Sequence, residues 1–203
     1  MAVKKEKVRI DNKILRLTEL GVLLALILLM GFTPIGYIRL GFIEMTIITV
    51  PVIVGAIVID SAAGALLGFV FGMTSFLQCV FGMSAFGVAL LEISPLYAFL
   101  VCVPTRTLMG WLTGLFFKAI KQNNVAGFGI TGLVGSLLNT LFFMSAFVGL
   151  YWKTPLIQGM EASSKGVFGF IIAVVGINGL IEAVACTILA AAICTALTRW
   201  FDS

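Results

Sequence analysis

Long apolar segments follow one another along almost the whole chain after residue 17, and few charged residues interrupt them. Each segment has close to the roughly 20 residues that an α-helix needs to cross the hydrocarbon core of a bilayer. Only 11% of the 203 residues are charged, whereas soluble domains contain about 25%. The pattern therefore predicts an all-α, polytopic membrane protein, with no length left for a separate catalytic domain.

Six membrane-spanning helices account for these segments and form one bundle. Their predicted ranges are Leu15–Phe32, Glu44–Ile59, Ala62–Phe81, Pro95–Ile120, Ala126–Leu150 and Gly166–Thr198. We assign residues 15–203 to one transmembrane domain and residues 1–14 to a basic segment that precedes it. The first span could be read as a signal peptide, but no small-residue cleavage site follows it, which favours an uncleaved helix.

The positions of lysine and arginine predict the orientation of the bundle. An even number of spans places both termini on one side, and most of the basic residues outside the spans lie on that side. Basic loops stay in the cytoplasm, so we expect both termini to be cytoplasmic. The same rule accounts for the net charge of +4, so no nucleic-acid partner is predicted. The longer connections face outward, where they favour capture of a ligand.

Several kinds of catalytic chemistry are excluded by residue types that the chain lacks. It contains no histidine, which removes histidine metal sites and the Ser-His and Cys-His nucleophile pairs. No GxxxxGK[ST] motif for nucleotide hydrolysis is present. The four cysteines have no CxxC spacing and are interpreted as buried free thiols. We expect a transport subunit rather than an enzyme, with no metal site and no cofactor.

Polar side chains within the spans are the candidates for a ligand site. Arg106 lies near the middle of the fourth span, where a charge costs about 2.5–3.5 kcal/mol on insertion scales. Two interpretations stay open: an ion pair between Arg106 and Glu182, or a polar pocket that opens to the outside. Asn139 and Asn178 could line such a pocket or join helices, and Phe143 could belong to an interfacial belt or a lid. The candidate substrate-binding residues are Arg39, Gln78, Arg106, Asn139, Phe143, Asn178 and Glu182.

Small residues at four-residue spacing mark faces where helices can approach closely. Gly64, Gly68 and Gly72 form a doubled GxxxG in the third span, for which packing inside the protein is the simplest interpretation. Gly21 and Ala25 repeat the spacing in the first span. That helix could sit at the periphery, so the pair could instead be a docking face for another membrane protein.

Three stretches resemble the substrate-binding S components of energy-coupling factor (ECF) vitamin transporters. They are LLMGFTPIGYIRLGFIEMTIITVPVIVGAIVID, GALLGFVFGMTSFLQCVFG and ISPLYAFLVCVPTRTLMGWLTGLFF. The resemblance covers essentially the whole chain. It implies a subunit in a prokaryotic plasma membrane that binds a vitamin from outside and delivers it through a T component and two cytoplasmic ATPases. Docking in the family uses Ala-x-x-x-Ala in the first span, matched here by Gly21 and Ala25 with one small residue changed.

Within this family the chain is most similar to pantothenate-type members, through TPIG, PVIVGA and FGMTSF. Pantothenate carries a carboxylate, an amide and two hydroxyls. Arg106 or Arg39 could pair with the carboxylate, while Asn139, Asn178 and Gln78 could meet the amide and the hydroxyls.

Other functions stay open at this point. The same capture role could serve pyridoxine or hydroxymethylpyrimidine, which need no arginine. A stand-alone, proton-coupled secondary transporter could use Glu182 as its protonation site. A scaffold protein without a ligand is a further possibility.

Overall fold

Helices make up almost all of the part of the chain that the structure describes. The computed structural model describes residues 12–33, 37–40, 43–154 and 167–202, and the side chains within 13–33, 47–154 and 179–199. The helices are α1 (Asn12–Phe32), α2 (Thr49–Val58), α3 (Ser61–Val80), α4 (Ala85–Ile93), α5 (Pro95–Ile120), α6 (Val125–Tyr151) and α8 (Val167–Asp202). A hairpin of β1 (Tyr37–Leu40) and β2 (Ile43–Thr46) precedes α2. The predicted helical membrane fold is confirmed, with the hairpin as an addition.

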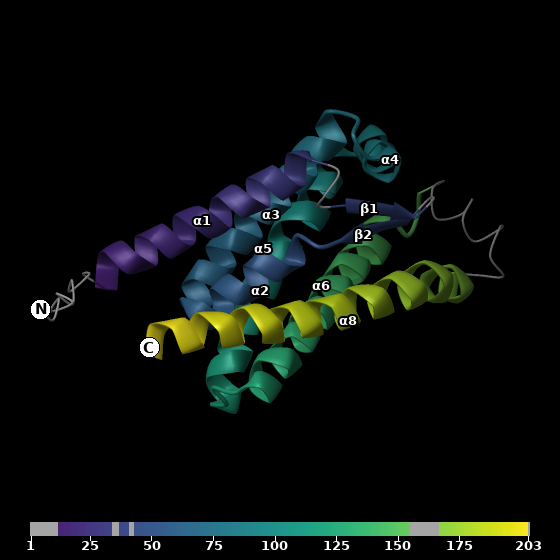
Figure 1. Ribbon diagram of the computed structural model, residues 1–203. Helices are drawn as coiled ribbons and strands as arrows, with labels where there is room; N and C mark the ends of the chain where they lie inside the picture. The colour runs from purple at the N-terminus through teal and green to yellow at the C-terminus, as the bar shows by residue number, and fades with distance from the viewer. Residues whose placement is uncertain (1–11, 34–36, 41–42, 155–166, 203) are drawn as a thin grey trace, which may run out of the picture.

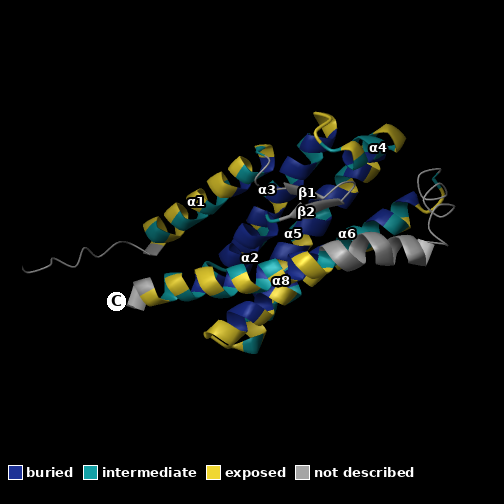
Figure 2. Cartoon of the chain, turned by 45° about the vertical axis from the view of Figure 1, so that its right-hand side comes forward, coloured by how far each residue is buried: buried dark blue, intermediate teal, exposed yellow. Residues whose placement is uncertain are grey.

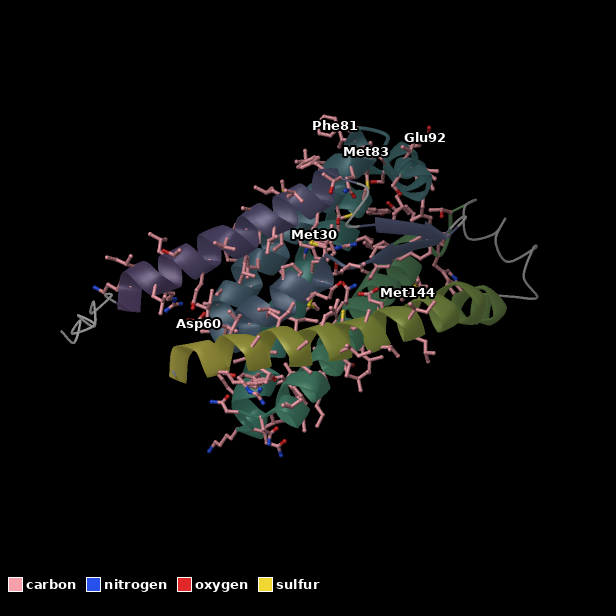
Figure 3. The ribbon with its side chains drawn as sticks, in the orientation of Figure 1. Met30, Asp60, Phe81, Met83, Glu92 and Met144 are labelled. Carbon is pink, nitrogen blue, oxygen red and sulfur yellow. The ribbon has the colours of Figure 1, made fainter. Side chains whose placement is uncertain are left out.

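The long helices run side by side, and the molecule has two distinct ends (Figure 1). At one end α1 begins and α8 finishes; we call this the terminal end. The hairpin and α4 lie toward the other end, which we call the hairpin end. Figure 3 shows Asp60 at the terminal end and Phe81, Met83 and Glu92 at the hairpin end. The two ends of the described chain therefore share one side of the bundle, as an even number of crossings requires.

Five helices in the described ranges are long and apolar enough to cross a membrane, namely α1, α3, α5, α6 and α8. The fourth predicted span, Pro95–Ile120, coincides with α5. Residues 1–11 of the predicted basic segment lie outside the described residues. The last three residues of that segment, 12–14, already belong to α1, which begins at Asn12. The six-span count holds if the short helix α2 is included.

The start of the second predicted span needs a correction. The prediction placed it at Glu44, but residues 43–46 form β2 and the helix α2 begins only at Thr49. Residues Ile43–Thr46 alternate apolar and polar side chains, which is the strand pattern. Pro51 lacks a backbone N–H and is best accommodated in the first turn of a helix, so the helix starts shortly before it. At 10 residues and about 1.5 Å per residue, α2 is about half as long as the hydrocarbon core is thick.

Side-chain caps fix where the helices begin. The side chains of Asp60, Ser84, Ser94 and Asn124 precede α3, α4, α5 and α6 and accept hydrogen bonds from backbone N–H groups three residues onward. Each cap satisfies a donor that has no partner inside the helix. The helix α5 ends at Ile120, and the residue after it, Lys121, caps it with a left-handed φ of 50°.

Glycines bring α3 and α5 into backbone contact. A Cβ atom on Gly68 would lie 2.2 Å from the carbonyl oxygen of Arg106, and one on Gly110 would lie 2.0 Å from that of Gly64. Gly72 approaches Cys102 in the same way. The interpretation of the doubled GxxxG as internal packing is therefore confirmed, and this contact fixes the position of Arg106 in the bundle.

Burial differs sharply between α2 and α1 (Figure 2). In α2 every residue from Thr49 to Ile57 is buried. In α1 most side chains are exposed or half-buried, and Ile27 alone among its described apolar side chains is fully buried. Gly21 and Ala25 are both exposed, and a Cβ atom on Gly21 would meet no atom within 4 Å. This face of α1 is therefore not used for packing within the described part of the chain.

A polar cluster at the terminal end holds the start of α1 to the body. Arg16 forms an ion pair with Asp60, and Lys118 Nζ donates to Ser61 Oγ at 3.1 Å. The backbone N–H of Ala63 donates to Asp60 Oδ1 at 2.7 Å. That hydrogen bond, with the charges of Arg16 and Lys118, lowers the pKa of Asp60 below its usual value.

Candidate functional site

Arg106 projects from the middle of α5 into the bundle and is only 9% exposed. Its Nη1 donates to the carbonyl oxygens of Cys102 at 3.1 Å and Val101 at 3.4 Å. Helical side chains lean toward the N-terminus of their helix, so Arg106 reaches the preceding turn. Pro104, inside α5, removes one helical hydrogen bond nearby and its ring crowds that turn. The guanidinium is thus held by the helix that carries it.

Two aromatic rings cover the guanidinium from other helices. Its carbon atom lies 4.7 Å from the ring centre of Phe71 in α3 and 5.3 Å from that of Phe143 in α6. Aromatic faces attract a cation at these distances, more strongly where water is excluded. Arg106 Nε is buried and has no hydrogen-bond partner within the described part of the chain. The arginine is therefore held in place while at least one donor is unused.

Glu182 is the second buried ionisable group and joins three helices. It lies in α8 and is 8% exposed. Thr49 Oγ1 in α2 donates to its Oε1 at 2.8 Å, and Asn139 Nδ2 in α6 donates to the same oxygen at 3.1 Å. Two hydrogen bonds from neutral donors hold this carboxylate, and both reach a single oxygen.

Arg106 and Glu182 do not form the ion pair that the sequence allows. The salt bridge between described side chains is Arg16–Asp60. Arg106 bonds to carbonyl oxygens of its own helix, whereas Glu182 bonds to Thr49 and Asn139. The ion-pair interpretation is therefore wrong, because Arg106 turns back along α5 while Asn139 and Thr49 hold Glu182. Two opposite charges face one interior region and neither neutralises the other by contact.

Gln78 lies elsewhere in the contact network. Its Nε2 donates to the carbonyl oxygen of Gly31, at the end of α1. Thr74, one turn earlier in α3, lies against the same glycine: a Cβ on Gly31 would be 3.2 Å from Thr74 Cβ. Among the described side chains, no hydrogen bond joins Gln78 to Arg106, Asn139 or Glu182. Its amide connects α3 to α1.

Two predicted site residues have side chains outside the described set. Arg39 lies in β1, where its backbone pairs with Glu44 in β2. Asn178 lies in α8, one turn before Glu182. The structure places these two positions along the backbone only.

Aromatic side chains form a continuous row at the hairpin end of α6. Phe143 stacks on Phe147 with ring centres 6.4 Å apart, and Phe147 contacts Tyr151 at 5.6 Å. Phe86 of α4 packs against Phe147 at 5.4 Å. Phe147 and Tyr151 are buried, and Tyr151 donates its hydroxyl proton to Leu90 O. These two rings belong to the interior under α4, and Phe143 connects the row to Arg106.

Two residues of the site were not predicted. Phe71 contacts the guanidinium of Arg106, and Thr49 bonds to the carboxyl group of Glu182. Phe71 sits in an apolar run where nothing in the sequence distinguishes it from a core side chain. Its place over Arg106 follows from the glycine contact of α3 with α5, so Gly68 and Gly72 were the available signal. Thr49 is a polar residue in an apolar stretch, but the partner on α8 lies 133 positions away.

The groups that the structure brings together suit non-covalent binding of a small molecule. Within the described residues, no group of three or more Cys, Asp or Glu side chains could hold a metal ion. The groups that converge are a guanidinium, a carboxylate, an amide, a hydroxyl and aromatic faces. Such a set suits a ligand with an anionic group and hydrogen-bonding groups.

Comparison with protein families gives a match that spans most of the chain. Residues 15–194 match the family described as ECF transporter, substrate-specific component. A comparison with curated proteins gives no match.

Proposed function

Because the chain belongs to the family of ECF transporter substrate-specific components, we propose that it captures a small vitamin from outside the cell. It then delivers the vitamin through a membrane T component and two cytoplasmic ATPases. In this proposal both termini and residues 1–14 are cytoplasmic, residues 15–203 form the transmembrane domain, and the membrane is the plasma membrane of a prokaryote. In this proposal the energy for transport comes from ATP hydrolysis by the partner ATPases.

The ligand that best fits the site is pantothenate. The observation that carries this choice is Arg106: it is nine-tenths buried, makes no ion pair with any described side chain and has a buried Nε without a partner among the described residues. Leaving a buried charge uncompensated is strongly unfavourable, by about 3–5 kcal/mol when a partner is removed. A ligand carboxylate would compensate it, and guanidinium geometry suits a carboxylate.

The remaining groups of pantothenate have complementary partners. Its amide and hydroxyls can meet Asn139 and Glu182, which lie together, while Phe143 covers the guanidinium from one side. Arg39, Asn178 and Gln78 stay proposed contacts from the hairpin, from α8 and from α3. Pyridoxine and hydroxymethylpyrimidine are alternatives that would leave Arg106 without a counter-charge.

Ligand-induced thermal stabilisation of the purified protein tests this proposal. A panel of pantothenate, pyridoxine and hydroxymethylpyrimidine should give a melting shift with pantothenate at the lowest concentration. A shift with a neutral vitamin alone would contradict the pantothenate assignment. No shift with a broad panel of vitamins would contradict the capture function itself and favour a scaffold.

A secondary transporter is the second candidate, and the buried Glu182 favours it because an intramembrane carboxylate can carry a proton. Vesicles that contain only this protein separate the two. Vitamin uptake driven by a proton gradient without ATPase partners would replace the proposed function. We expect uptake only with the T component, both ATPases and ATP.

The docking face for the T component is proposed on α1, around Gly21 and Ala25. Both residues are exposed, and the space over Gly21 is open. Gly21→Trp should abolish co-purification with the T component and leave vitamin affinity unchanged. Gly129→Trp, placed where a Cβ meets Thr187 at 3.5 Å, is the matched internal control and should destabilise the fold. Equal loss of vitamin binding in Gly21→Trp would show that α1 packs internally.

A further inference from the structure

The two oxygens of Glu182 have different surroundings. Oε1 accepts hydrogen bonds from Thr49 Oγ1 at 2.8 Å and from Asn139 Nδ2 at 3.1 Å. A carboxylate oxygen has two lone pairs, so these donors fill its capacity. Oε2 accepts no hydrogen bond from any side chain or backbone group that the structure describes. The ligand-binding capacity of Glu182 is therefore concentrated on Oε2.

Oε2 is available to a donor on a bound molecule. Glu182 is 8% exposed, and a hydrogen bond to a charged group contributes about 1.5–3 kcal/mol. Bilayer tails cannot supply such a donor. A hydroxyl or N–H group of a bound molecule would gain this hydrogen bond at Oε2.

Thr49 differs from the other buried threonines of the bundle in where its hydroxyl bonds. Thr113 and Thr131 are as completely buried as Thr49, but each donates to the carbonyl four residues earlier in its own helix. This local bond is the ordinary way a threonine is accommodated in an apolar helix. Thr49 instead bonds across to α8, from the first position of α2.

We infer that Thr49 is a positioning residue of the binding site, and that it acts through Glu182. With Asn139, it occupies Oε1 and turns Oε2 toward the ligand, which must offer a hydroxyl or N–H donor there. Combined with the anion that Arg106 requires, the ligand class is a small acid with a hydrogen-bond donor remote from its carboxylate. This inference rests on the proposed capture function. The positioning role of Thr49 does not depend on which vitamin is bound, whereas the acidic ligand class does and falls if a neutral vitamin binds instead.

The first test removes the hydroxyl without changing the shape of the side chain. Thr49→Val should raise the dissociation constant of the ligand about tenfold, which corresponds to the loss of one hydrogen bond to a charged group. Thr49→Ser keeps the donor and should stay within about threefold of the wild type. Thr131→Val is the matched control, because it removes an equally buried hydroxyl that bonds only its own helix, and its affinity should be unchanged.

The second test reverses the polarity of the ligand-facing atom. Glu182→Gln replaces one carboxylate oxygen with an NH2 group. With the remaining oxygen accepting from Thr49 and Asn139, the NH2 group lies at the position of Oε2 and donates where Oε2 accepted. Affinity should fall about a hundredfold, and Thr49→Val added to Glu182→Gln should cause little further loss because the two act together. Isothermal titration with pantothenate, pyridoxine and hydroxymethylpyrimidine serves all variants, since each compound carries a hydroxyl donor.

The outcomes separate this inference from the proposed function. If Thr49→Val lowers the melting temperature of the ligand-free protein but leaves the dissociation constant unchanged, Thr49 only joins helices and the inference is overturned. Thr49→Ser binding as weakly as Thr49→Val overturns it as well. Binding of pyridoxine in place of pantothenate, with the same Thr49 effects, overturns the pantothenate assignment and supports the role of Thr49. If no compound binds the wild type, both are overturned.

Discussion

The protein contains two combinations of an arginine with a carboxylate, and they are arranged in opposite ways. Arg16 and Asp60 at the terminal end form an ion pair, with side chains 55% and 23% exposed. Arg106 and Glu182 in the interior are 9% and 8% exposed and bond to other groups. A pair in water gains little from contact, about 0–1 kcal/mol. A pair in the interior would gain far more, yet it is the interior pair that stays apart.

The difference separates structural charges from charges that are available for binding. Arg16 fastens α1 to the turn before α3, and its charge is satisfied by a protein group. Arg106 is positioned by carbonyl oxygens and aromatic rings, none of which cancels its charge. A buried charge that is held without being neutralised is the usual condition of a binding or catalytic group.

The largest expected effect comes from removing the interior arginine. Arg106→Ala should weaken pantothenate binding at least about a hundredfold, because the ligand carboxylate loses its buried partner. Arg106→Lys should retain part of the affinity, since an ammonium keeps the charge without the planar fork. Isothermal titration calorimetry measures both. If Arg106→Ala binds pantothenate with unchanged affinity, the ligand carboxylate binds somewhere other than Arg106 on α5.

The double variant tests whether Arg106 and Glu182 are energetically coupled. Glu182→Ala added to Arg106→Ala should not restore folding stability, because the two side chains share no direct bond. A rescue of more than about 1 kcal/mol in denaturant unfolding would instead show an energetically important pair.

A smaller effect is expected from disturbing the backbone that carries Arg106. Gly68→Val should lower the free energy of unfolding by about 2 kcal/mol, because its Cβ would lie 2.2 Å from Arg106 O. Gly21→Val is the matched control at an open position and should leave stability unchanged. Thermal unfolding in detergent measures both. If Gly68→Val and Gly21→Val melt at the same temperature, α3 and α5 can move apart without a loss of stability.

The smallest effect is expected at the terminal end. The pKa of Asp60 is lowered, so the ionised form contributes stability that is complete above the usual carboxyl pKa. This contribution is lost as the pH falls through the lowered value. Asp60→Asn keeps the helix cap and should cost less than about 1 kcal/mol at neutral pH. Its unfolding free energy should depend less on pH below about pH 4 than that of the wild type. An identical acid dependence would show that Asp60 does not contribute.

Helix positions could be predicted from the sequence where local signals were strong. Ser94 and Pro95 mark the start of α5. Lys118 in the last turn and Lys121 after the helix mark its end. The hairpin was missed because β1 and β2 have only 4 residues each and lie inside an apolar stretch that a span could also explain. Short apolar runs do not separate strand from helix by periodicity.

The candidate site was predictable in its residue types but not in its contacts. Arg106, Asn139 and Glu182 stood out because polar groups are rare inside membrane helices. Whether Arg106 meets Glu182 depends on side-chain direction in three dimensions, which spacing along a helix does not give. Phe71 carried no signal of its own, since a phenylalanine over a cation has the same sequence surroundings as one in a core.

The short helix α2 and the hairpin before it also bear on how water reaches the site. A two-stranded sheet leaves a row of backbone amide and carbonyl groups along its outer edge, and lipid tails cannot hydrate such groups. β2 lies beside α8, so protein covers one flank, and the other flank must face an aqueous or protein environment. The free edge of the hairpin is therefore expected to contact water or protein rather than lipid tails. If the proposed function holds, a charged vitamin would keep part of its hydration shell until it reached Thr49, where α2 begins.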